Sequence, residues 1–130
     1  MKYISPNDLF KHWTYVREGL DRIQAKTPEN YLPEDVYAGI KAGSLHLYVD
    51  DGKCFAILQS IQGWKGLEVH VFAAYSLDPK VMDYAFDEVK EIARKAGASK
   101  LTFCTRRKGW ERRAKQLGYK KSQTHYELEL

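Results

Sequence analysis

Glu68 and His70 are the residues whose types and spacing best fit acid–base chemistry. They stand two positions apart in Leu67–Ala74, a segment whose apolar residues alternate as in a β-strand. Side chains two apart on a strand project from the same face, so either group could accept a proton there as a general base. The alternative is a solvent-facing pair opposite the buried valines of the strand. The sequence leaves both interpretations open.

A strongly basic segment near the C-terminus is the second candidate. Residues 106–121 hold eight basic residues and one acidic residue, whereas the rest of the chain holds 13 basic and 16 acidic residues. This asymmetry favours an anionic partner, and we prefer the acidic surface of a protein to nucleic acid or coenzyme phosphates. The alternative is a solvated helix face. The expected partner-binding residues are Arg106, Arg107, Lys108, Arg112, Arg113 and, at a predicted hairpin tip, Trp64.

Trp64 and Trp110 each allow two interpretations. Trp64 is either a contact residue or an isolated exposed hydrophobe. Trp110 lies in the basic segment and could stack on a nucleic-acid base. Its helical spacing to Ala114 and Leu117 favours packing inward instead.

Other classes of site are not expected. The four histidines show no ligand spacing with one another or with the two cysteines, so we expect no metal site. Cys54 and Cys104 lie in apolar, strand-like contexts and are expected to be reduced and buried. The chain has no apolar run of about 18 residues and no secretory leader, so we expect a cytoplasmic protein without a membrane partner.

The hydrophobic pattern predicts the elements that hold these residues. Predicted helices cover 6–27, 33–43, 79–97 and 109–117, and predicted strands cover 45–49, 54–62, 67–74 and 101–105, with a stub at Tyr3-Ile4 and a closing strand within Tyr119–Leu130. The strand after the third helix must run parallel to the strand before it, because a crossover joins them. The sequence therefore predicts one α+β domain over 1–130. Its sheet is mixed and mostly antiparallel, with two N-terminal helices, one β-α-β crossover and a short C-terminal helix and strand.

This order of elements, with Gly109-Trp110-Glu111-Arg112 and Leu117-Gly118-Tyr119 near its end, resembles the GNAT (Gcn5-related N-acetyltransferase-like) family. The resemblance implies the GNAT fold over nearly the whole chain. Similar short GNAT-like proteins with this ending are frequent in bacteriophage genomes, where they are often counted as virion or morphogenesis proteins. The resemblance therefore also implies a virion or host-interaction role if the chain is phage-encoded.

The predicted cofactor loop departs from the family pattern. Active members carry a glycine-rich loop after the third meander strand, whose bare amides grip the coenzyme A pyrophosphate. The equivalent stretch here is Ala73–Lys80, which has no glycine, contains Pro79, and places Asp78 near the phosphate position. A carboxylate there would repel a diphosphate. Asp78 is better explained as the N-cap of the following helix.

The residue implied for acid catalysis is also missing. Family members place a tyrosine four positions before the Gly-aromatic pair, where it protonates the departing thiolate. Here that position is Ala114. Tyr75, Tyr84 or Cys104 could approach the cleft instead, and nothing in their spacing singles one out. If the chain is an enzyme, the catalytic candidates are Glu68, His70 and Tyr75, and the cofactor-binding candidates are Phe72, Ala74, Arg106 and Arg107.

Three functions follow from these observations. The favoured one is a degenerate, non-catalytic GNAT-fold protein that binds a macromolecular partner and needs no cofactor. The alternative is an acyl-CoA-dependent N-acyltransferase with an atypical cofactor loop, which would use acetyl-CoA. The third is a nucleic-acid-binding module built on residues 106–121. A homo-oligomer is compatible with all three.

Overall fold

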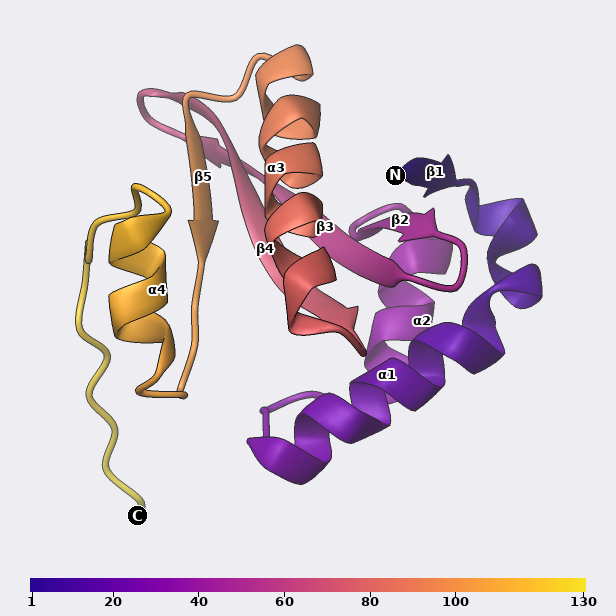
Figure 1. Ribbon diagram of the computed structural model, residues 1–130, viewed down its shortest axis with the longest axis horizontal. Coiled ribbons are helices and arrows are strands. Elements are labelled where there is room, and N and C mark those ends of the chain that lie inside the picture. Colours follow the sequence, from indigo (N-terminus) through magenta and orange to yellow (C-terminus); the bar gives the residue numbers. More distant parts are fainter.

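The computed structural model describes residues 1–130 as a five-stranded sheet with helices on both faces (Figure 1). The elements in chain order are β1 (Lys2–Ile4), the 3-10 helix η1 (Pro6–Lys11), α1 (Trp13–Lys26), α2 (Pro33–Ala42), β2 (His46–Asp50), β3 (Cys54–Gly63), β4 (Gly66–Ser76), α3 (Pro79–Lys95), β5 (Lys100–Phe103) and α4 (Trp110–Gln116).

The sheet follows the chain, with the order β1-β2-β3-β4-β5. The first four strands pair antiparallel with one another, and β5 is parallel to β4 because α3 crosses over between them. The predicted α+β class, mixed sheet and single crossover are therefore confirmed.

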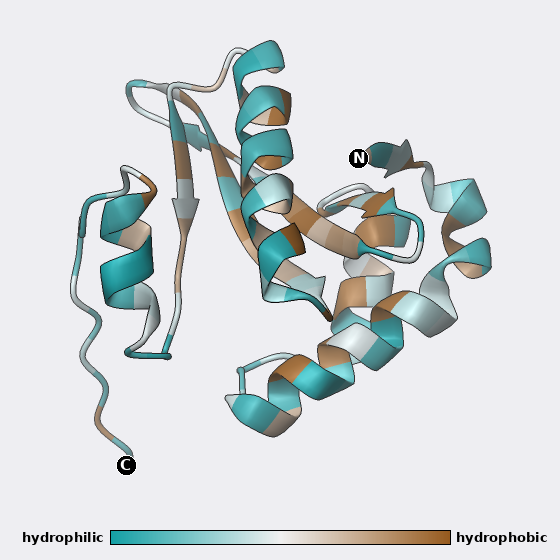
Figure 2. Ribbon diagram, viewed as in Figure 1, coloured by the Kyte–Doolittle hydropathy of each residue, from teal (hydrophilic) through white to brown (hydrophobic).

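Two hydrophobic clusters lie on opposite faces of the sheet. The larger joins η1, α1 and α2 to one face and holds 12 buried residues, including Phe55 and Ile57 of β3. The smaller joins α3 to the other face and holds Ala56 and Leu58 of the same strand. Successive residues of β3 thus belong to opposite clusters, because successive side chains of a strand point to opposite faces of the sheet. The helices turn their brown, apolar sides to the sheet in Figure 2.

The structure corrects two predicted helix features. The expected helix from Pro6 to Thr27 is interrupted at His12, where a 3-10 turn gives way to α1. Ser5 does not cap this helix, because its hydroxyl lies 3.3 Å from a carboxylate oxygen of Asp8 instead of receiving a backbone amide.

Two predictions for the C-terminal part are wrong. The short C-terminal helix forms as α4, but no strand follows it, since no neighbouring strand pairs with residues 119–130. A strand exists only through its hydrogen bonds to a neighbour, so the apolar alternation of Tyr126–Leu130 is not sufficient. Cys54 is buried as predicted, whereas Cys104 is exposed because it lies one residue beyond β5.

A β-bulge in β4 shapes the centre of the sheet. Ile57 of β3 pairs with Ala73, and Leu58 pairs with Val71, so Phe72 is left without a partner. Pairing of β4 with β5 ends at Val71 and Phe103, although β4 continues to Ser76. The two parallel strands therefore separate just past the bulge.

None of the helices combines the length and the apolar run needed to cross a bilayer.

Helix α1 approaches the sheet closely at Gly19, which gives a test of the packing. A Cβ atom at Gly19 would lie 2.5 Å from Phe55 Cε2 and 2.8 Å from Tyr75 Cδ1. We expect Gly19→Ala to lower the free energy of unfolding by about 1–3 kcal/mol, because this overpacking outweighs alanine's helix propensity. Urea denaturation followed by circular dichroism measures the change. The control Asp21→Ala, on the exposed face of α1, should change it by less than about 0.5 kcal/mol.

Candidate functional site

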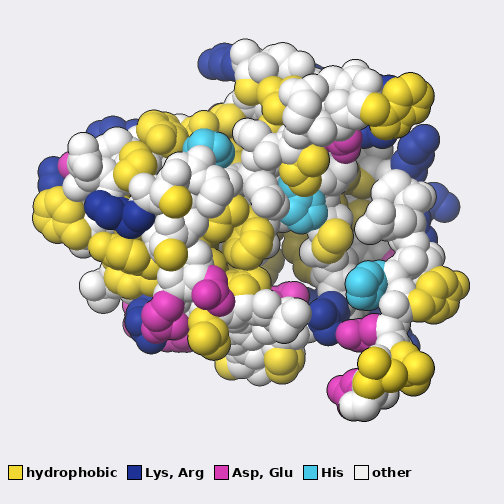
Figure 3. Space-filling view, turned by 180° about the vertical axis from the view of Figure 1, so that it is seen from behind, with side chains coloured by type: hydrophobic (Ala, Val, Ile, Leu, Met, Phe, Trp, Pro, Cys, Tyr) yellow, Lys and Arg dark blue, Asp and Glu magenta, His cyan; other side chains and the backbone are white.

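The candidate site lies at the fork where β4 and β5 separate. Beyond Val71 and Phe103 the two strands lose their ladder, and the chain after β5 turns away toward α4 (Figure 1). Seen from behind in Figure 3, the surface is hollowed between the part that holds α1 and α2 and the part that holds β5 and α4. A crevice where parallel strands part is a common place for ligands in α/β sheets.

His70 stands on β4 just before the bulge and faces Thr102 of β5 in the parallel register. Its Nδ1 lies 2.8 Å from the Thr102 hydroxyl oxygen. Burial lowers the pKa of His70 below its usual value, so the imidazole is neutral at pH 7. In the tautomer that donates the Nδ1 proton to Thr102, Nε2 keeps a lone pair that can accept a proton; in the other tautomer Nδ1 accepts from the Thr102 hydroxyl and Nε2 carries the proton.

Glu68 projects from the same face as His70 but does not contact it. It is opposite Lys100 in the β4–β5 register, which places opposite charges across the two strands. Its carboxylate bends back over Gly63 at the end of the β3–β4 hairpin, in space that a Cβ atom would fill. Glu68 is therefore at the hairpin end of the face, away from the fork.

Tyr75 is not brought together with His70. They are five positions apart on β4, which corresponds to about 16 Å at a rise of about 3.3 Å per residue. The Tyr75 hydroxyl accepts a hydrogen bond of 3.1 Å from Nη1 of Arg22 on α1, and its ring packs against Phe55. This hydrogen bond is the main reason that the pKa of Arg22 is raised above its usual value.

The two predicted cofactor contacts on β4 face opposite sides of the sheet. Phe72 packs on the α1 side, with its ring centroid 4.9 Å from that of Tyr31 in the α1–α2 loop. Ala74 packs on the α3 side, against the smaller cluster. A single ligand on one face of the sheet would therefore meet only one of them.

The N-terminus of α3 is closed by its own cap. Asp78 accepts a hydrogen bond of 2.9 Å from the Lys80 amide, as predicted for an N-cap, and Pro79 has no amide to offer. Ser76 fixes the turn, because its hydroxyl accepts from the Asp78 amide and donates to the Asp78 carbonyl. The amide groups that would grip a pyrophosphate are therefore partly used, and the capping group is itself an anion.

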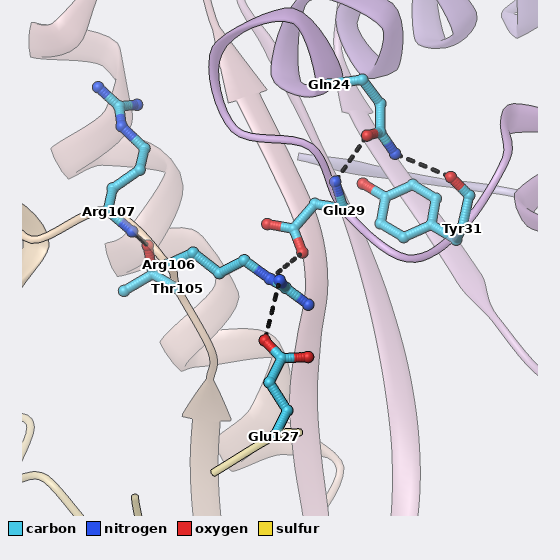
Figure 4. A network of polar contacts seen from close by, with 7 residues as sticks. All are labelled: Gln24, Glu29, Tyr31, Thr105, Arg106, Arg107 and Glu127. Carbon is cyan, nitrogen blue, oxygen red and sulfur yellow. Dashed lines mark hydrogen bonds and ion pairs between the residues drawn. The ribbon is translucent and has the colours of Figure 1, made fainter. Parts of the chain in front are cut away.

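Arg106 is held between two carboxylates on the far side of the fork (Figure 4). Its guanidinium lies 3.6 Å from Glu29 of the α1–α2 loop and 3.7 Å from Glu127 of the C-terminal tail. These residues line a polar pocket of about 230 Å³ together with Pro28 and Asn30. Because two carboxylates surround one guanidinium, Arg106 is poorly placed to attract a phosphate as the structure stands.

The α1–α2 loop is organised by Gln24, which the sequence analysis did not single out. Its side chain accepts a hydrogen bond of 2.6 Å from the Glu29 amide and donates one of 2.8 Å to the Tyr31 carbonyl (Figure 4). Burial, assisted by Glu29, raises the pKa of Tyr31 to about 12, so the phenol stays protonated. Thr102 was also missed. Only the β4–β5 register reveals it.

The remaining basic residues form an exposed surface. Arg107, Lys108 and Arg112 make no ion pair, whereas Arg113 is paired with Asp83 of α3. The Arg107 amide donates to the Thr105 hydroxyl, and its side chain points away from the Arg106 pocket (Figure 4). A partner or a phosphate group could therefore reach three cations here.

The two tryptophans have opposite environments. Trp64 is 92% exposed at the β3–β4 hairpin tip, with the Lys65 ammonium 5.0 Å above its ring. Trp110 packs inward, with its ring centroid 5.5 Å from that of Phe86 and 5.7 Å from that of Phe103. Trp110 is therefore a packing residue and is not free to stack on a base.

No three of the histidine, cysteine, aspartate and glutamate side chains gather as metal ligands.

Comparison with known proteins shows similarity at the level of structure alone. No protein-family model matches the chain, and no curated protein matches it. A solved structure described as a probable acetyltransferase superposes with a TM-score of 0.71 at 13% identity, covering 100% of this chain and 98% of the other.

Two further structures have similar scores. A ribosomal-protein-alanine N-acetyltransferase from Brucella melitensis biovar Abortus 2308 gives a TM-score of 0.69 at 12% identity, covering 98% of this chain and 97% of the other. A predicted acetyltransferase with acetyl-CoA from Clostridium acetobutylicum gives 0.66 at 13% identity, covering 98% and 94%. The chain therefore has the GNAT-like fold that its sequence resembles, and the expectation of a non-catalytic protein gains no support from these neighbours.

The lowered pKa of His70 predicts a pH dependence of stability. At high pH the imidazole is neutral in both states. As the pH falls below about 6.5 the unfolded chain takes up this proton before the folded protein does, so the free energy of unfolding decreases. We expect His70→Gln to make this decrease shallower between about pH 7 and pH 5, measured by urea denaturation at each pH. His125→Gln, on the exposed tail, is the control. Identical slopes for wild type and His70→Gln would contradict the assignment.

Proposed function

We propose that this GNAT-fold chain is an acyl-CoA-dependent N-acyltransferase in which His70 is the general base. The observation that supports it is the 2.8 Å contact between His70 Nδ1 and Thr102, made at the fork between the two parallel strands. The solved structures with the same fold are mostly described as acetyltransferases, which supports the reaction class.

His70 would prepare the acceptor. An ammonium group has no lone pair, so a protonated amine must lose a proton before it can attack an acyl group. A neutral imidazole with a free Nε2 can accept that proton at pH 7, and Thr102 holds the ring in place. Glu68 is bent toward the hairpin and Tyr75 is about 16 Å away by strand rise, so neither acts on the same proton.

Acetyl-CoA would supply the acyl group, but the chain fits its diphosphate only in part. The Asp78 carboxylate occupies the Lys80 amide at the α3 N-terminus, where a phosphate would otherwise bind. The exposed side chains of Arg107 and Lys108 can contact phosphates, since neither is engaged in an ion pair. We therefore expect binding of acetyl-CoA to be weak.

The Asp78 carboxylate also favours a second candidate function. A protein that no longer uses acetyl-CoA would tolerate Asp78 at its helix cap and Ala114 in place of the acid. Its exposed cations Arg107, Lys108 and Arg112, with Trp64 on the hairpin tip, would then serve an acidic macromolecular partner. A place in a phage particle or on a host factor belongs to this second candidate and stays a prediction from the sequence.

Binding of acetyl-CoA separates the two candidates. We expect calorimetric titration of the wild-type chain to show saturable binding of acetyl-CoA at or below millimolar ligand. Asp78→Asn should bind about two- to fivefold more tightly, because asparagine keeps the helix cap and removes the negative charge. The control Asp87→Asn changes an exposed carboxylate in the middle of α3 and should leave the affinity unchanged. Absence of saturable binding by both wild type and Asp78→Asn would exclude the acyltransferase.

Activity tests the role of His70. With acetyl-CoA and a panel of primary amines, release of free thiol should fall about 10²- to 10⁴-fold in His70→Gln, since a positioned general base contributes this much. The control is His46→Gln on β2, which is half-buried and pairs with β3 away from the fork. Wild-type rates for His70→Gln over the whole pH range would eliminate His70 as the base.

A further inference from the structure

The outer edge of β5 is open. β5 pairs with β4 on one side only and is the last strand of the sheet. Backbone amides and carbonyls on such an edge are free to pair with another strand, and natural proteins usually block them. The opposite edge is the three-residue β1, which is short. β5 instead presents the partly buried apolar residues Leu101 and Phe103.

The C-terminal tail has the composition of a strand but no partner. Residues 120–130 make no backbone hydrogen bond, and in Figure 1 the tail descends on the outer side of α4, separated from β5. Tyr126, Leu128 and Leu130 are 88%, 83% and 115% exposed and alternate with Glu127 and Glu129. Exposed apolar residues with the period of a strand indicate a segment that binds something.

We propose that two copies of the chain exchange these tails, so that residues 126–130 of each copy add to the β5 edge of the other as an antiparallel strand. Each copy offers both the open edge and the free strand, so the exchange is reciprocal and closes into a two-fold dimer. The apolar tail and the apolar edge are covered in the same step.

One antiparallel register matches the side chains on both faces. With Tyr126 opposite Phe103, Leu128 stands opposite Leu101, on the α3 side of the sheet where both β5 residues pack. Tyr126 then extends the aromatic cluster in which Phe103 contacts Tyr119 at 5.0 Å between ring centroids.

The acidic residues match the other face in the same register. Glu129 stands opposite Lys100, which places opposite charges across the new strand pair. Glu127 stands opposite Thr102, the residue that contacts His70, so each tail would bring a carboxylate to the fork of the other copy.

The exchange disrupts little of the isolated chain. The one ion pair of the tail joins Glu127 to Arg106 at 3.7 Å, and both side chains are at least half exposed, so it contributes little stability. Arg106 keeps its contact with Glu29. Residues 120–125, which lead from the end of α4 to Tyr126, make no backbone hydrogen bond and can follow a new path.

Disulfide trapping tests the register. His125 would stand opposite Cys104 of the second copy, so His125→Cys should form an intermolecular disulfide with the native Cys104 in oxidised glutathione. The product is a band of twice the chain mass on a non-reducing gel, removed by reduction. Two controls should run at the mass of a single chain on the same gel: His125→Cys combined with Cys104→Ser, and Thr124→Cys, whose side chain would point to the other face. A disulfide within one chain, or none, would overturn the exchange.

Sedimentation velocity tests the dimer itself. We expect wild type to be dimeric at tens of micromolar, and Leu128→Asp to raise the dissociation constant at least tenfold. Because Leu128 is exposed in the single chain, circular dichroism should confirm that this variant still folds. Leu32→Asp, at another exposed leucine just before α2, should leave the dimer intact. A wild-type chain that is monomeric at all concentrations up to millimolar would refute the proposal.

Discussion

The β-bulge at Phe72 turns two successive side chains of β4, Phe72 and Ala73, toward the same cluster of the core. A strand without a bulge would send one of them to the opposite face. The extra residue also rotates the far half of β4 away from β5, so their ladder stops at Val71 and Phe103. The fork, the position of His70 before it and the contact between Phe72 and Tyr31 all depend on that one unpaired residue.

Three acidic side chains, at two places, define what the fork can accept. Asp78 closes the α3 N-terminus by taking the Lys80 amide, and Glu29 with Glu127 surrounds Arg106. Both places would otherwise attract phosphates, since one offers helix amides and the other a guanidinium. The chain thus retains the geometry of the fold while its own carboxylates weaken the attraction for a diphosphate. A donor that binds here must be held largely by contacts other than those two.

Much of the fold could be predicted from local patterns. Asp78 and Pro79 mark the start of α3, and the alternation of residues 67–74 marks β4, because both signals arise from neighbouring residues. The connection through α3 made a parallel β5 the expected partner of β4. The GNAT-like topology followed from that order of elements.

The contacts of the candidate site could not be predicted in the same way. His70 and Thr102 are 32 positions apart, and Arg106 and Glu29 are farther still, so their meeting depends on strand register and loop conformation. The bulge also shifts the β3–β4 register by one residue, without a glycine to signal it. The closing strand was predicted because apolar and acidic residues alternate over 126–130. This alternation shows which side chains would share a face of a strand, but it carries no information about which other strand would pair with it.

Gln24 has a consequence for the motions of the fork. One side chain on α1 bonds the loop at both Glu29 and Tyr31, so the loop cannot open without carrying the last turn of α1 or breaking both bonds. The α1–α2 loop on this side of the fork is therefore firmly held, and the ring of Tyr31 also packs against Phe72 of β4. The segment after β5, on the facing side, is joined to the α1–α2 loop only by the ion pair of Arg106 with Glu29. If the fork widens, we expect the segment between β5 and α4 to move as a hinge while α1 and its loop stay in place.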